Sequence, residues 1–398
     1  MSAEQNAVAK FWNGRGMRKL RRDRMAMLSL SVIGLYLVLG LAVAFGLIDE
    51  DDVFERSGPD EIAGAWGHQD GEKRLSDAEF YIESVERAAR SSRPEEALTE
   101  LSFGHLRPVP GSPEEVQKLV DQAWISFDAV AEYEELDDDP EVVKLLATLE
   151  ADVAALYPPP AGFEGLLQSF RTSLGTDRQG RSIMLRALYS AKVAIQIGIV
   201  AALFSVLLGT FLGAAAGYFG GWVDHAVVWL YSTFSSIPWI VLLMVLASMF
   251  RGGPFDGTLV PIYAAFCMSF WISPCRIIRG EVMKLKELEY VQAASAIGFS
   301  RLRILIKHII PNTVHLMFIN FSLLFIGAIK AEVILSFLGL GVKNEPSWGV
   351  MINHAKAEVL NGFFWQIGAA TFFMLILVLA FNILSDALQD AFDPKHVS

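Results

Sequence analysis

Six apolar segments set what this chain can fold into. They lie at residues 25–48, 193–218, 225–250, 259–278, from about 314 onward, and 364–384. A helix needs roughly 20 apolar residues to cross the hydrocarbon core of a bilayer, where it satisfies its own backbone hydrogen bonds. The composition agrees, since 53% of the residues are hydrophobic and the mean hydropathy is +0.39. We therefore expect an all-α, polytopic membrane protein with six transmembrane helices.

The charged residues are divided unevenly along the chain. Residues 49–174 carry 30 acidic and 10 basic residues, a net charge of −20, whereas the rest carries 14 acidic and 23 basic residues, a net charge of +9. Basic residues dominate the tail at 1–24 and the loop at 279–312, and such loops face the cytoplasm. We expect both termini in the cytoplasm and residues 49–174 on the extracytoplasmic side. Residues 175–398 are then a membrane domain with five further spans.

The acidic stretch at 49–174 is expected to form a largely helical insertion. Capping boxes are predicted at Ser76 with Glu79 and at Ser112 with Glu115. After Pro113 and after Pro140, apolar residues recur with helical spacing and need a partner surface. The insertion is then either a docking surface for an extracytoplasmic partner or added bulk, and the sequence leaves both open.

The stretch at 289–312 is the most organised polar sequence, reading EYVQAASAIGFSRLRILIKHIIPN. It predicts a short helix, a turn at Gly298, and a second helix that begins after Ser300 and ends near Pro311. The second helix has an apolar face, which is formed by Leu302, Leu305, Ile306, Ile309 and Ile310. The first helix offers small side chains to a partner, at Gln292, Ala293 and Ala294. The alternative is a loop that only joins two spans.

Three features inside the spans point to packing or to a pathway. Glycines at four-residue spacing predict close helix packing, at Gly209, Gly213 and Gly217. Pro238 predicts a kink, of structural or pathway origin. Lys330 and Glu332 are either part of a pathway or interfacial residues that reach the outer surface.

Several motifs occur in one order around these spans. They are the 292–298 segment with Ile310 and Pro311, LGTDRQGR at 174–181, YFGGWVD at 218–224, SFLGLG at 336–341, PSWG at 346–349, and the ending at 386–394. Together they resemble the inner-membrane permease subunits of ATP-binding-cassette (ABC) importers, and among them the C-type permeases of the dipeptide, oligopeptide and nickel group. The chain departs from that family in having Gln292 in place of the usual glutamate, and in the length of its insertion.

The resemblance implies a permease subunit that forms half of a translocation pathway for peptides or similar small solutes. It implies these partners: a homologous second permease, two ATPase subunits, an extracytoplasmic solute-binding protein and the lipid bilayer of the bacterial inner membrane. It also implies ATPase coupling through the 289–312 loop, at Gln292, Ala293, Ala294, Gly298 and Pro311.

Other functional classes have less support in the sequence. No G-x-x-x-x-G-K-[ST] phosphate loop is present, so we expect ATP and Mg²⁺ to be used by partner subunits and this chain not to be an enzyme. Cys267 and Cys275 lie in apolar sequence, and neither a metal site nor a nucleic-acid partner is expected. The alternatives are a membrane-anchored sensor or assembly factor that works through the acidic domain, and, with least support, a membrane enzyme with a site at Lys330 and Glu332.

Overall fold

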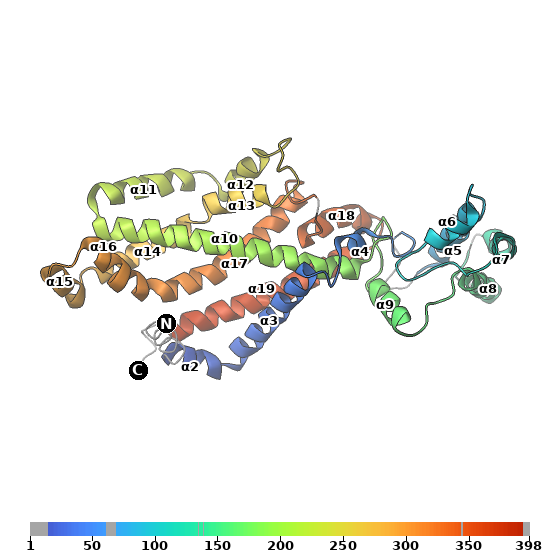
Figure 1. Ribbon diagram of the computed structural model, residues 1–398, viewed down its shortest axis with the longest axis horizontal. Helices are drawn as coiled ribbons and strands as arrows, with labels where there is room; N and C mark the ends of the chain where they lie inside the picture. The colour runs from blue at the N-terminus through green and yellow to red at the C-terminus, as the bar shows by residue number, and fades with distance from the viewer. Residues whose placement is uncertain (1–14, 61–68, 134, 138, 344, 393–398) are drawn as a thin grey trace. The chain divides into compact units, whose positions relative to one another are not determined.

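The structure, a computed structural model, describes residues 15–60, 69–133, 135–137, 139–343 and 345–392. It is built from helices (Figure 1), which confirms the expected fold class. In chain order the helices are α2 (Arg15–Arg22), α3 (Arg24–Ala44), α4 (Glu50–Phe54), α5 (Gly71–Ala89), α6 (Pro94–Glu100), α7 (Pro113–Ala131), α8 (Pro140–Leu156), α9 (Gly162–Thr172), α10 (Ile183–Phe219), α11 (Gly221–Ser235), α12 (Trp239–Ser248), α13 (Val260–Ser269), α14 (Ile272–Leu285), α15 (Glu289–Ala296), α16 (Arg301–Ile304), the π-helix η1 (Leu305–Ile309), the 3₁₀-helix η2 (Ile310–Thr313), α17 (Val314–Phe337), α18 (Trp348–Leu360) and α19 (Trp365–Phe392).

Five helical segments of the described chain are long and apolar enough to cross a membrane. They are Arg24–Ala44, Ile183–Phe219, Val260–Leu285, Arg301–Phe337 and Trp365–Ala391. A sixth span exists if α11 and α12 are counted as one, although they meet at a bend of 87°. The segments match the six predicted ones in order, but α10 begins ten residues before the predicted 193 and the fifth begins at Arg301 instead of about 314.

The chain divides into two compact units. The membrane unit consists of the described residues of Met1–Phe45, Ser190–Asn353 and Phe372–Ser398, and the insertion unit consists of those of Gly46–Tyr189 and His354–Thr371. The insertion unit therefore extends beyond the predicted 49–174 block, because it also takes in the motif at 174–181 and a segment near the C-terminus.

In the membrane unit, α3 and α19 lie side by side (Figure 1). The Tyr36 hydroxyl donates a hydrogen bond to the Phe373 carbonyl at 2.8 Å. Ala26 and Ala387 lie in one apolar cluster together with Leu20. Small residues at this contact let the two helices approach, so the N-terminal span is attached to the last one.

The insertion unit has its own core, formed mainly by α5, α7 and α8. Ile82, Val120 and Leu146 are fully buried in it. The helical spacing after Pro113 and Pro140 is confirmed by α7 and α8. Burial of three apolar helix faces against each other gives this segment a stable core of its own.

One of the two predicted capping boxes is present. Ser112 and Glu115 exchange side-chain and backbone hydrogen bonds at the start of α7. The prediction at Ser76 is wrong, because α5 already begins at Gly71 and Asp70 accepts from the Lys73 backbone N–H at 2.9 Å. An aspartate is as effective an N-cap as serine, and the earlier cap determines the start of the helix.

Candidate coupling site and membrane cavity

The short helix α15 is fixed to the rest of the membrane unit by two side chains. Val291 and Ala294 are 3% and 6% exposed and pack in a cluster with Ile278, Ile304 and Ile309. Figure 1 shows α15 at one end of the helices α14 and α16. The prediction that all three small-sided residues are exposed is therefore wrong for Ala294, because that side chain is what holds α15 in place.

The outward face of α15 is formed by its other residues. Gln292 and Ala293 are exposed, and Ile297, which follows the helix, is 76% exposed. The Gln292 side-chain amide donates to the Glu287 carbonyl at 3.0 Å, so it folds back over the chain that leads into α15. The outward face is therefore small and polar, with the exposed side chain of Ile297 at its end.

Gly298 ends α15 for a backbone reason. Its φ of +94° is left-handed, the Gly298 N–H donates to the Ser295 carbonyl, and the Phe299 N–H donates to the Ala294 carbonyl at 3.2 Å. This pattern satisfies the last carbonyls of a helix and favours glycine at the left-handed position. A Cβ at Gly298 would meet no atom within 4 Å, so the requirement is conformational and not steric crowding.

The second helix of the predicted pair does not end at Pro311. Residues 301–304 are α-helical, 305–309 form a π-helix and 310–313 a 3₁₀-helix, and α17 follows without a break. Pro311 lies in the first turn of the 3₁₀-helix, where its missing N–H is tolerated. The prediction of a terminated helix is therefore wrong, and the segment is the start of the 37-residue run Arg301–Phe337.

The apolar face of that segment also differs from the prediction. Leu305 and Ile309 are buried as expected, but Leu302 and Ile306 are 57% and 54% exposed, and Ile304 is buried in their place. The π-helix adds a residue to the turn and rotates the face relative to a regular α-helix.

Polar and aromatic contacts connect α15 to the same segment. The Asn312 amide donates to the Tyr290 hydroxyl at 2.9 Å and to the His308 carbonyl at 2.7 Å. Phe299 stacks on His308, with ring centroids 6.2 Å apart, and the Arg303 guanidinium lies 4.9 Å from the Phe299 ring centroid. These contacts join the turn after α15 to the start of the long helix.

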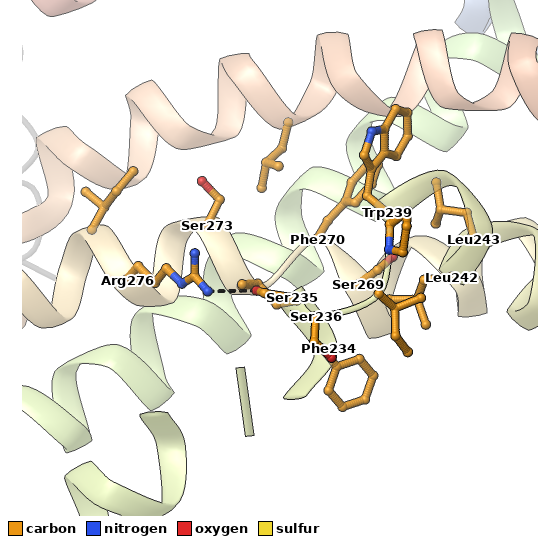
Figure 2. Close-up of a pocket in the computed structure, with 15 residues that line it drawn as sticks. Phe234, Ser235, Ser236, Trp239, Leu242, Leu243, Ser269, Phe270, Ser273 and Arg276 are labelled. Carbon is orange, nitrogen blue, oxygen red and sulfur yellow. Dashed lines mark hydrogen bonds between the residues drawn. The ribbon is translucent and has the colours of Figure 1, made fainter. Parts of the chain in front are cut away.

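Pro238 lies at the bend between α11 and α12. Its ψ of 125° is extended, and a cavity of about 720 Å³ opens beside the bend. Figure 2 shows Trp239, Leu243 and Phe270 around this cavity, with Arg276 reaching from α14 toward Ser235. The Arg276 guanidinium donates to the Ser235 hydroxyl at 2.7 Å and lies 4.6 Å from the Tyr231 ring centroid. Sequence reasoning missed Arg276 as a cavity residue, although an arginine at the end of an apolar segment was the available signal.

Lys330 and Glu332 are not brought together. Lys330 is exposed, whereas Glu332 is 4% exposed and its Oε1 accepts hydrogen bonds from the Ser336 and Ser347 hydroxyls, both at 2.6 Å. A Cβ on Gly349 would lie 3.0 Å from Glu332 Oε1. Buried polar groups are normally hydrogen-bonded, and these two hydrogen bonds have a structural role, because through Glu332 they connect the motifs at 336–341 and 346–349.

The glycine row on α10 lies against the backbone of the fourth span. A Cβ on Gly209 would come within 2.6 Å of the Trp271 carbonyl, and one on Gly217 within 2.7 Å of the Arg279 carbonyl. A Cβ on Gly213 would likewise come too close to the Cys275 carbonyl oxygen. Any larger residue in this row would push the two helices apart.

In the insertion unit, the segment at 174–181 is organised around Asp177. This side chain is 1% exposed and accepts from the backbone N–H groups of Gln179 and Arg181, from the Arg181 guanidinium at 2.6 and 2.8 Å, and from Arg186. Burial alone would raise the pKa of Asp177, but the charges of Arg186 and Arg181 hold that pKa below its usual value. The carboxylate is therefore ionised and fixes the turn.

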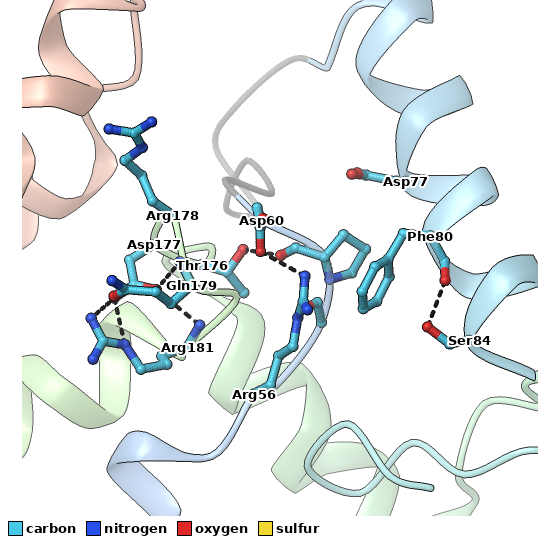
Figure 3. A network of polar contacts seen from close by, with 12 residues as sticks. Arg56, Asp60, Asp77, Phe80, Ser84, Thr176, Asp177, Arg178, Gln179 and Arg181 are labelled. Carbon is cyan, nitrogen blue, oxygen red and sulfur yellow. Dashed lines mark hydrogen bonds and ion pairs between the residues drawn. The ribbon is translucent and has the colours of Figure 1, made fainter. Parts of the chain in front are cut away.

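Figure 3 shows how the start of the insertion joins this turn. The Arg56 guanidinium pairs with Asp60 at 2.6 Å and lies 4.0 Å from the Phe80 ring centroid. The Thr176 hydroxyl donates to the Pro59 carbonyl at 2.8 Å. These contacts connect the turn at 174–181 to both the linker at 56–60 and the helical core.

Comparison with known proteins gives a consistent result. Residues 193–397 match the family of binding-protein-dependent transport system inner membrane components. Over 222 residues the chain is 38% identical to the dipeptide transport system permease protein of Bacillus subtilis, covering 56% of this chain and 68% of that protein.

Two further relatives agree. The chain is 35% identical over 223 residues to the oligopeptide transport system permease protein of Haemophilus influenzae, covering 56% of this chain and 70% of that protein. It is 32% identical over 269 residues to the corresponding protein of Mycobacterium tuberculosis, covering 65% and 91%. The expected relationship is confirmed: the chain belongs to the family of binding-protein-dependent transport system inner membrane components and is an ABC importer permease of the peptide group.

Proposed function

We propose that this chain forms half of a pathway that carries peptides or similar small solutes across the bacterial inner membrane. A homologous second permease supplies the other half, two ATPase subunits use ATP and Mg²⁺, and an extracytoplasmic solute-binding protein delivers the solute. The names of the relatives support this solute class. The family match covers residues 193–397, which hold the spans that follow the insertion, and not the insertion itself, which favours a permease over a membrane-anchored sensor.

The observation that carries the coupling role is the attachment of α15 to the long helix that follows. Val291 and Ala294 bury one side of α15, while Gln292 and Ala293 stay exposed on it. Because 301–337 is helical throughout, a displacement of α15 by an ATPase moves a span as a rigid body. The ATPase contact must differ between the inward-open and outward-open states, since an equal contact would drive no change.

The coupling residues then have distinct roles. Gln292 and Ala293 contact the ATPase, Ala294 anchors α15, Gly298 provides the left-handed turn, and Pro311 lies in the segment that passes the motion to α17. In this proposal both termini and the 279–312 loop are cytoplasmic, and the basic residues of that loop support the orientation.

Substitutions in α15 test the coupling role. Ala293→Trp adds bulk to the contact face, and Gly298→Pro removes the N–H bonded to Ser295 and cannot adopt a positive φ. Both are expected to abolish uptake and co-purification of the ATPases while the protein stays in the membrane. Ala151→Trp, at an exposed alanine of α8, is the control for added bulk and should leave co-purification of the ATPases intact. ATPase binding and uptake at the normal level in both variants would reject the role.

The insertion is tested separately. Its core cluster, from Leu75 to Tyr157, lies wholly within residues 60–160, so this segment can be deleted as one body. A docking surface predicts weaker binding of the solute-binding protein to the deleted transporter, whereas added bulk predicts unchanged uptake and unchanged affinity.

A further inference from the structure

We propose that the cavity at the bend between α11 and α12 binds the C-terminal carboxylate of the transported peptide, with Arg276 as the residue that contacts it. The inference rests on the proposed function in one respect, which is that the solute is a peptide. It adds a position in the membrane unit where part of the solute is recognised.

The cavity has the size and lining of a small-molecule site. Its volume of about 720 Å³ lies within the roughly 300–1,000 Å³ found for ligand pockets. Trp239, Phe270 and Leu243 provide an apolar wall, and the hydroxyl-bearing residues Ser269 and Ser273 lie on the α13 and α14 side (Figure 2). A few polar groups in a mostly apolar wall are what orients a ligand inside such a pocket.

Arg276 differs from the neighbouring arginine on the same helix. Arg279, about one turn further along α14, forms an ion pair with Asp224, in which Nη2 and Oδ2 are 2.7 Å apart. Among the residues that the structure describes, Arg276 has a serine hydroxyl and an aromatic face as its partners, and no carboxylate.

The position of Arg276 makes this difference meaningful. It lies near the cytoplasmic end of the fourth predicted segment, and its exposed side chain is part of the cavity lining, where it can reach a bound solute. A guanidinium group can donate two parallel hydrogen bonds to one carboxylate. An anionic group in the cavity therefore suits this guanidinium group, and every peptide with a free C-terminus carries one.

The bend adds a second electropositive feature to the same cavity. The first backbone hydrogen bond of α12 runs from the Leu242 N–H to the Pro238 carbonyl. The N–H groups of the first turn of α12 therefore do not donate to carbonyls within the helix. Ile237, Pro238 and Trp239 line the cavity, which places the N-terminus of this ten-residue helix at its wall. The N-terminal ends of broken membrane helices carry partial positive charge and attract anionic groups of solutes.

The test compares a peptide with its uncharged counterpart in the complete transporter. The transporter, reconstituted in proteoliposomes with its solute-binding protein, is supplied with radiolabelled dialanine or with the C-terminal amide of dialanine. Arg276→Gln is expected to lower uptake of dialanine about tenfold, which corresponds to one lost charge-assisted interaction, and to change uptake of the amide less than about twofold. Any preference of the binding protein is the same for both transporters and cancels when the peptide-to-amide ratios are compared.

Two variants and two further readouts complete the design. Arg276→Lys keeps the charge without the planar guanidinium group. Its ratio of peptide uptake to amide uptake should lie between those of the wild type and Arg276→Gln, and it provides the comparison if the glutamine variant does not assemble. Arg279→Gln breaks the ion pair with Asp224 and should affect both solutes equally. Assembly is measured by co-purification of the ATPases and activity by ATP hydrolysis.

The outcomes separate the two proposals. The assignment of Arg276 is overturned if its variants lose uptake of both solutes equally, or if they lose uptake of neither. A wild-type complex that assembles but transports neither solute overturns the peptide-import function and the assignment together.

Discussion

Pro238 and Pro311 both interrupt apolar helical sequence, with opposite results. At Pro238 the helix ends at Ser235 and resumes at Trp239, with a bend of 87°. At Pro311 the chain stays helical from Arg301 to Phe337. The local chemistry is the same, since each proline lacks an N–H and its ring collides with a preceding carbonyl in an α-helix.

Packing explains the difference. Before Pro311, Leu305 and Ile309 are buried in the cluster that also holds α15, so the segment keeps its direction and adjusts through the π and 3₁₀ turns. Around Pro238, by contrast, residues 235–239 are exposed along the cavity. A proline therefore marks where a membrane helix can break, and the neighbouring contacts determine whether it does.

The largest effect is expected from loosening the contacts near Pro311. Ile309→Ala removes a fully buried side chain from the cluster under α15, and such changes lower the free energy of unfolding by about 2–5 kcal/mol. We expect lower thermal stability in detergent and weaker ATPase co-purification, because α15 loses part of its support.

Ile306→Ala is the matched control for that variant. Ile306 is in the same π-helix but 54% exposed, so the change in unfolding free energy should stay within about 0.5 kcal/mol. Equal losses for the two variants would mean that burial in the cluster is not what keeps the segment near Pro311 continuous.

The sequence predicts much of this fold because bilayer crossing depends on length and hydropathy, which are local properties. The order of the spans, α7 and α8 follow from such patterns. The boundaries of α10 and of the fifth span do not, because the polar residues that extend them are held by side-chain contacts, Arg186 by the buried carboxylate of Asp177 and Arg303 by the Phe299 ring. The start of α5 was misplaced because two adequate caps compete there.

The site is less predictable than the fold. Motif spacing located the 289–312 segment, and Gly298 followed from backbone conformation alone. The exposure of Ala294 could not be predicted from the segment, since it depends on Ile278 and Ile304. The separate environments of Lys330 and Glu332 likewise depend on Ser347, which lies outside that helix.

A smaller effect is expected from one hydroxyl group in each proline segment. Thr313 and Ser236 make the same bond, from the side-chain hydroxyl to the carbonyl three residues earlier, at 2.9 and 2.7 Å. Thr313 is fully buried and Ser236 is exposed. Thr313→Val should lower the unfolding free energy by about 1 kcal/mol, and Ser236→Ala by less than about 0.5 kcal/mol, because water replaces only the exposed bond. Thermal unfolding in detergent measures both, and a larger loss for Ser236→Ala would contradict the role assigned to packing.

The smallest change in stability, but a measurable change in shape, is expected from replacing the prolines themselves. Pro238→Ala permits helical backbone where little packing opposes it, so the bend should decrease. At 1.5 Å per residue, Cα atoms at Trp229 and Val245 are about 24 Å apart in a straight helix and about 17 Å apart at a right-angled bend. Both side chains are exposed, and spin labels there, after Cys267 and Cys275 are replaced, report the distance.

Pro311→Ala is the counterpart, with spin labels at the exposed Leu302 and Leu323. Their separation should stay the same, because contacts with α14 and α15 already hold that helix in one direction. A bend that persists in Pro238→Ala would show that contacts, and not the proline, maintain the break beside the cavity. A shift in Pro311→Ala would show that the proline itself shapes the segment from Leu305 to Thr313. Either result would remove the distinction drawn between the two helices.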